Sequence, residues 1–190
     1  MNTPSHTVLN LAILSRKGRP KLNLPIVIGS LLPDLAMFWF YFWTRGVQRL
    51  PDGKIWGELY YDPIWQDVFD VGNSIPLALL GVAIAVYYRR PAIAALFASI
   101  FLHCLFDLPL HNDDAHRHFL PFSNFRFESP ISYWDPDHYG AIAAFFEVSL
   151  VLISSVYVFR ILHSKFGKGM LIAINLFYLA GYFFFYTQGN

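Results

Sequence analysis

The sequence predicts an all-α polytopic membrane helix bundle, with about five transmembrane helices plus a short N-terminal half-helix. Hydrophobic residues make up 55% of the 190 residues and charged residues only 14%, which is too apolar for an ordinary soluble domain of this size. The apolar residues form long segments, and polar residues gather between them. We expect residues 1–190 to form a single membrane-embedded domain whose principal partner is the lipid bilayer.

Five segments are long and apolar enough to span or nearly span a bilayer, which requires about 20 residues. A further apolar stretch, Thr7–Leu14, is too short to span, and we expect it to be a half-inserted or interfacial helix. The five expected spans are Leu22–Trp43, Val71–Tyr88, Pro91–Leu110, Gly140–Phe159 and Met170–Thr187.

The positions of the basic residues orient these spans. Nine of the 14 Lys and Arg residues lie in three connections at residues 16–21, 89–90 and 160–168, which hold no Asp or Glu. The positive-inside rule places these connections in the cytoplasm. The two long polar loops, 44–70 and 111–139, then face the opposite side, and their Trp and Tyr residues suit a membrane interface. A net charge of +1 gives no basic face for nucleic acid, so we expect no nucleic-acid contact.

Four ionisable residues fall inside the expected spans, where such residues mark functional sites by default. A helical rise of about 1.5 Å per residue gives the depth of each residue above the cytoplasmic end of its span. This depth is about 18–24 Å for Asp34, His103, Asp107 and Glu147. His6 reaches about 15 Å if the N-terminal piece is a half-helix. These residues therefore belong to one layer, in the half of the bilayer that faces away from the basic connections.

Their chemistry suggests a metal site. His103 and Asp107 share one helix face because they are four residues apart. More candidate ligands follow directly after Pro109. Zn²⁺ binds imidazole and carboxylate groups, three or four at a time, and carboxylate-rich sets also suit Mn²⁺ or Fe²⁺. The candidate metal ligands are His6, Asp34, His103, Asp107, His111, His116, His118 and Glu147.

Simpler interpretations exist for each part of this set. Asp34 follows Pro33, and its role could be only to cap or break a helix. His103 and Asp107 could form a structural hydrogen bond within the bundle. The histidines of residues 111–118 could belong to a solvated loop. The agreement in depth favours the metal site over these readings taken together.

Several motifs resemble a known family. They are Ser5-His6-Thr7, residues 29–34 (GSLLPD), the His103/Asp107 pair, residues 114–123 (DAHRHFLPFS) and residues 129–136 (SPISYWDP). Together they resemble the inner-membrane-associated metal-dependent hydrolases, sometimes labelled LexA-binding. The resemblance runs from about Ser5 to Glu147, and it implies an integral protein of the bacterial inner (plasma) membrane.

A more distant similarity is to zinc-dependent phospholipase C, an all-helical enzyme with His, Asp and Glu ligands. It implies His103, Asp107, a loop histidine and Glu147 as ligands, with His6 and Asp34 completing the site. Two positions depart from these patterns. Asn73 stands where family members often carry His, and Ala143 stands where the phospholipase pattern has His four residues before its late Glu.

These patterns together predict a membrane-embedded metal-dependent hydrolase acting on a lipid or other phosphoester. Asp114 is the expected general base, and Arg117 or Arg126 is expected to hold a phosphate. Asn73 completes the expected catalytic set. The alternative is a non-catalytic metal-binding or scaffold protein, whose buried polar residues only join helices.

Overall fold

The computed structural model describes residues 1–186, which contain no β-strand and are 73% helical. The chain runs through eight α-helices in that part, most of them beginning at or beside a proline or a capping side chain. Ser74 and Asp62, for example, cap the helices that follow them by accepting from the amides of Leu77 and Ile64. The helices are α1 (Thr3–Leu14), α2 (Asn23–Tyr41), α3 (Asp52–Gly57), α4 (Pro63–Gly72), α5 (Ile75–Tyr87), α6 (Pro91–Asp107), α7 (Gly140–Ile161) and α8 (Lys165–Tyr186).

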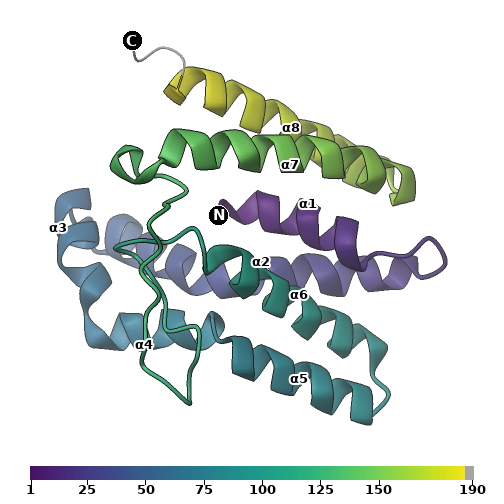
Figure 1. The fold of residues 1–190 in the computed structure, drawn as a ribbon, viewed down its shortest axis with the longest axis horizontal. Helices are drawn as coiled ribbons and strands as arrows, with labels where there is room; N and C mark the ends of the chain where they lie inside the picture. Colours follow the sequence, from purple (N-terminus) through teal and green to yellow (C-terminus); the bar gives the residue numbers. More distant parts are fainter. Residues whose placement is uncertain (187–190) are drawn as a thin grey trace.

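Short irregular turns connect some of these helices. The end of α2 continues into a wider, π-helical turn at Phe42–Val47, and 3₁₀ turns occur at Pro20–Leu22, Leu59–Tyr61 and Pro136–His138. The long connection between α6 and α7 is otherwise without regular structure. It folds back over the ends of α4 and α6 (Figure 1).

Helix α1 lies in the middle of the bundle, between the α7–α8 pair and a layer made by α2, α5 and α6 (Figure 1). It contacts α2, α6 and α7, and its side chains from Val8 to Leu11 are all buried. With 12 residues it is too short to cross a bilayer, as the sequence predicted. It begins at Thr3, earlier than the expected start at Thr7, and it packs inside the bundle, where its polar side chains find partners. Its position as a half-inserted or interfacial helix stays a prediction.

Three helical segments are long and apolar enough to cross a membrane: Pro20–Val47, Gly140–Ile161 and Lys165–Phe185. The pair α4 and α5 would form a fourth if it acts as one span, but it bends by 40° at the break near Asn73. Helix α6 has only 17 residues, since it ends at Asp107 shortly before Pro109. Five full spans are therefore not confirmed, and Thr187, the expected end of the last one, lies outside the described residues.

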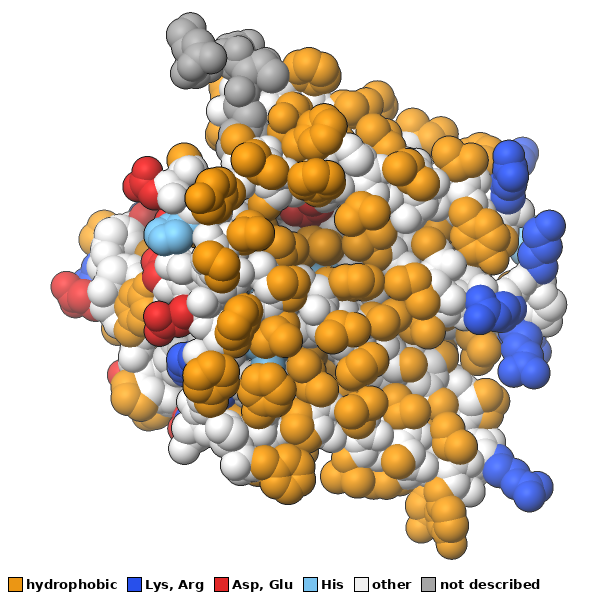
Figure 2. All heavy atoms as spheres, in the orientation of Figure 1, with side chains coloured by type: hydrophobic (Ala, Val, Ile, Leu, Met, Phe, Trp, Pro, Cys, Tyr) orange, Lys and Arg blue, Asp and Glu red, His pale blue; other side chains and the backbone are white. Residues whose placement is uncertain are grey.

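Charged residues separate to the two ends of the bundle. The α1–α2, α5–α6 and α7–α8 turns, which carry the basic connections, lie at the same end (Figure 1). Lys and Arg side chains gather there, Asp and Glu side chains gather at the opposite end, and hydrophobic side chains cover the surface between them (Figure 2). Large apolar side chains such as Leu24, Ile153 and Phe177 are exposed.

Close packing of α2 against α6 fixes the geometry of the interior. At Gly29 a Cβ atom would run into the carbonyl oxygen of Leu96 and lie 2.9 Å from the Cβ of Ser99. Small residues allow such close approach of membrane helices. Ser99 also donates a 2.6 Å hydrogen bond to the Ile26 carbonyl oxygen. This contact places Asp34 and His103 at the same level of neighbouring helices.

We expect Gly29→Ala to destabilise the protein by about 1–3 kcal/mol, because the added methyl group overpacks the α2–α6 contact. Gly169→Ala is the matched control, since Gly169 is also helical but has nothing within 4 Å of an added Cβ. That control should be neutral or stabilising by up to about 1 kcal/mol. Thermal melts of the purified proteins in detergent measure both effects. Equal melting temperatures for the two variants would contradict the packing argument.

Candidate metal centre

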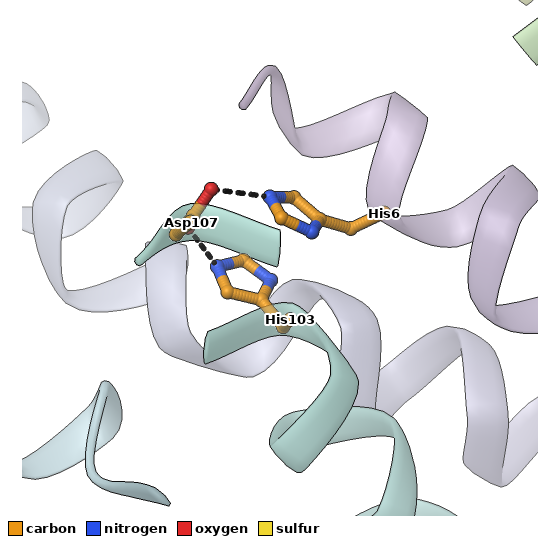
Figure 3. A group of neighbouring side chains, drawn as sticks. All are labelled: His6, His103 and Asp107. Atoms are coloured by element: carbon orange, nitrogen blue, oxygen red, sulfur yellow. Dashed lines mark ion pairs between the residues drawn. The ribbon is translucent and has the colours of Figure 1, made fainter. Parts of the chain in front are cut away.

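Two helices bring three ligand-type side chains together inside the bundle. His103 and Asp107 lie one turn apart on α6, and His6 reaches them from α1 (Figure 3). His6 Nε2 lies 3.0 Å from Asp107 Oδ1, and His103 Nε2 lies 3.0 Å from Asp107 Oδ2. One candidate ligand atom from each residue lies within 4.8 Å of the others, and all three residues are buried. We call His6, His103 and Asp107 the central cluster.

Asp34 borders this cluster from α2. Its Oδ1 atom lies 3.5 Å from His103 Nε2, and its Oδ2 atom accepts a 2.5 Å hydrogen bond from the Thr3 hydroxyl. Its side chain is 15% exposed, whereas those of His6 and His103 are fully buried. Asp34 is therefore the member of the set that is reached most easily from outside. Helical depth predicted that Asp34, His103, Asp107 and Glu147 would converge and that His6 would approach them. The structure brings His6, Asp34, His103 and Asp107 together, without Glu147.

The hydrogen bond of His103 Nδ1 identifies which ring nitrogen carries the proton. Nδ1 lies 2.8 Å from the Ser30 carbonyl oxygen, which can only accept, so Nδ1 carries the proton. A neutral imidazole then presents a lone pair at Nε2, and this atom is buried without a hydrogen-bond partner among the described residues. Its lone pair faces carboxylate oxygens, an arrangement that needs a cation or a proton between them. A ligating histidine typically donates its other N–H in this way.

His6 has the same character. Its ring stacks on that of His103 at 3.7 Å between centroids, and neither of its nitrogens has a hydrogen bond in the described part of the chain. The amino group of Met1, which sequence reasoning missed, lies 2.6 Å from Asp107 Oδ1 and 3.4 Å from His111 Nε2. The central cluster thus already attracts positive charge.

The three histidines at residues 111–118 are buried instead of being solvated. His111 lies between two carboxylates, with Nε2 3.5 Å from Asp107 Oδ1 and Nδ1 2.9 Å from Asp114 Oδ2. His118 donates from Nδ1 to the Asn73 carbonyl oxygen at 2.8 Å. Burial and the neighbouring His116 lower the pKa of His118 to about 4. The ring is therefore neutral at about pH 7, and its Nε2 atom carries a free lone pair. The simpler reading of residues 111–118 as a solvated loop is wrong for these side chains.

Asp70 holds the connection in place, and sequence reasoning missed it by assigning it to a polar loop. Its carboxylate is fully buried at the end of α4 and accepts from Arg117 Nε at 2.5 Å and Arg126 Nη2 at 2.7 Å. His116 Nδ1 lies 3.3 Å from Asp70 Oδ1, and Arg117 also pairs with Asp67. Both arginines that were expected to hold a phosphate are thus bound to carboxylates.

The remaining predicted residues lie around the cluster. Asp114 contacts His111 and accepts from Trp134 Nε1 at 3.3 Å. Asn73 donates to the Phe69 carbonyl oxygen, and its own side-chain oxygen is buried without a partner among residues 1–186. Glu147 on α7 accepts from Asn2 and Ser5. Ser5 is the neighbour of His6 on α1. The role of Glu147 as a metal ligand stays a prediction.

Comparison of the chain with known protein families, with curated proteins and with solved structures found no match. The resemblance to the inner-membrane hydrolases therefore stays an expectation.

We expect His103→Ala to lower the metal content of the purified protein at least about tenfold, since it removes a ligand from a buried set. His163→Ala is the matched control, because His163 is exposed in the α7–α8 connection and should leave metal content unchanged. Elemental analysis of matched preparations gives metal per chain. A metal-free wild type whose melting temperature is indifferent to chelator and to added Zn²⁺ or Mn²⁺ would refute the metal centre.

Proposed function

We propose that this chain is a membrane-embedded, metal-dependent hydrolase that acts on a lipid or another phosphoester. One observation carries the proposal: in the central cluster, imidazole nitrogens and carboxylate oxygens face one another with no hydrogen bond between them. His103 Nε2 and His6 Nε2 each lie 3.0 Å from an oxygen of Asp107, yet neither nitrogen has hydrogen-bond geometry. A divalent cation is the partner that such a donor set fits.

The proposed role of each residue follows from its position. His6, His103 and Asp107 would hold the ion, most readily Zn²⁺, with Mn²⁺ or Fe²⁺ as alternatives. Bound there, the ion supplies Lewis-acid chemistry, polarising a phosphoryl oxygen and lowering the pKa of a water molecule. Asp34, the most exposed of the four, borders the side from which a substrate would approach. Asp114 remains the proposed general base, through its contact with His111.

A second candidate function is metal binding without catalysis. It is favoured by the engagement of Arg117 and Arg126 with Asp70, which leaves neither guanidinium group free to hold a phosphate. In that case the cation would serve to join α1 and α6, because it balances carboxylates that are otherwise costly to bury.

We also propose the orientation and the number of spans. The proposed spans are α2, the bent pair of α4 and α5, α6, α7 and α8. If each of these five crosses the bilayer, the basic end faces the cytoplasm by the positive-inside rule. The α6–α7 connection and the central cluster then lie toward the extracytoplasmic side of a bacterial inner membrane.

A pair of single-cysteine proteins tests this orientation. In a Cys104→Ala background, Glu128→Cys and Lys17→Cys place one thiol at each end of the bundle, both at exposed positions. An impermeant thiol reagent added to intact cells should label the first protein and not the second. Labelling of only the Lys17→Cys protein would reverse the proposed orientation.

Hydrolysis tests the function itself. We expect the wild type to cleave a chromogenic phosphodiester, to lose this activity with a chelator and to regain it with Zn²⁺ or Mn²⁺. Asp34→Asn should lower kcat/KM about 10- to 100-fold, a usual effect of weakening a metal site, whereas Asp137→Asn at an exposed position should not. A stoichiometric metal without any hydrolysis would instead favour the non-catalytic function.

A further inference from the structure

A second polar feature lies beside the central cluster, around Glu147 on α7. A cavity of about 170 Å³ opens between the outer halves of α7 and α8 and the α6–α7 connection. The carboxylate of Glu147 borders it, and most of the remaining lining is aromatic. The aromatic side chains are Tyr133, Trp134, Phe177, Tyr178, Tyr182 and Phe185.

Glu147 is buried there and forms no ion pair with a described residue; the amino group of Met1, next to its donor Asn2, pairs with Asp107 instead. Its side chain accepts from the Asn2 backbone amide at 3.0 Å, the Asn2 side-chain amide at 3.1 and 3.2 Å, and the Ser5 hydroxyl at 2.5 Å. The Tyr178 hydroxyl lies at 3.4 Å. All of these donors are neutral, and no Lys, Arg or His among the described residues forms an ion pair with Glu147. Only 3% of the residue is exposed, so water does not balance its charge either.

The hydrogen bonds to Glu147 also restrict what can bind. Oε1 already accepts from Asn2 and Ser5, and Oε2 accepts from the Asn2 side chain. Few lone pairs remain for a new donor. A primary ammonium group brings three N–H donors that need acceptors, whereas a quaternary ammonium group brings none. The latter gains instead from the faces of aromatic rings and from a nearby negative charge.

We infer that the Glu147 cavity is a binding site for a quaternary ammonium group. The aromatic rings surround the alkyl groups, and the Glu147 carboxylate supplies the compensating charge without needing to accept a hydrogen bond. The site is distinct from the central cluster, because Ser5 directs α1 toward Glu147 while the adjacent His6 faces Asp107. It does not depend on the presence of a metal or on hydrolysis.

Titration calorimetry on the detergent-purified protein tests this inference, with tetramethylammonium chloride as the probe and methylammonium chloride as the comparison. We expect the wild type to bind tetramethylammonium at least about tenfold more tightly than methylammonium. Glu147→Gln, which keeps the shape of the side chain and removes its charge, should weaken tetramethylammonium binding at least about tenfold. Glu128→Gln, an exposed control, and His103→Ala, in the central cluster, should both bind as the wild type does.

A second variant keeps the test valid if Glu147→Gln fails to fold. Trp134→Leu changes the cavity wall at a half-exposed side chain of the connection and should also weaken binding of the probe. Equal affinity of the wild type and both cavity variants for tetramethylammonium, or equal affinity of the wild type for the two ammonium ions, would overturn the proposal.

Two further ligands distinguish a lipid headgroup from a free quaternary amine. They are choline and a short-chain phosphatidylcholine in non-ionic detergent. Tighter binding of the lipid than of choline assigns the site to a lipid headgroup. Equal affinities assign it to a free quaternary amine. Both outcomes depend on Glu147 if the inference holds, so Glu147→Gln is measured with each ligand.

Discussion

Asp107 is 2% exposed, in the interior of a bundle that exposes many large apolar side chains. A charge in that position is costly unless it is paired and hydrogen-bonded. The amino group of Met1 pairs with this charge directly. His103 from the same helix, His6 from α1 and His111 from the α6–α7 connection place ring nitrogens within 3.5 Å of it, where a bound cation would complete the pairing. Helix α1 occupies the centre of the bundle largely because its polar face satisfies this one requirement.

The polar interior extends beyond Asp107 along α1. One turn after His6, Asn10 donates to the carbonyl and the hydroxyl oxygen of Ser99 at 2.9 and 2.8 Å. Ser99 in turn bonds to α2, at the level where Gly29 allows the helices to approach. The position of the histidines is therefore set by close contacts of small and polar residues, which are directional, as well as by apolar packing between helices.

Sequence reasoning predicted the helical fold class and the convergence of His6, Asp34, His103 and Asp107. It succeeded because helical rise converts residue number directly into depth. It also predicted that Glu147 would converge with them, whereas the hydrogen bonds of Glu147 go to Asn2, Ser5 and Tyr178. Depth alone does not give the direction of a side chain around the bundle. Asp70 was missed for a related reason. Its burial depends on Arg117 and Arg126, and such long-range pairing leaves no local pattern. The break between α4 and α5 was hidden by the apolar character of both flanks.

The short length of α1 has a consequence for how the protein is made. Its 12 residues extend about 18 Å, well short of the roughly 30 Å hydrocarbon core, so the translocation machinery cannot insert it as an independent span. The partners of Ser5, His6 and Asn10 lie on α6, α7 and α8, which the ribosome synthesises much later. In a bundle embedded in a membrane, as we propose, helix α1 would enter only after those helices have been inserted. The polar centre would then be completed late in biogenesis.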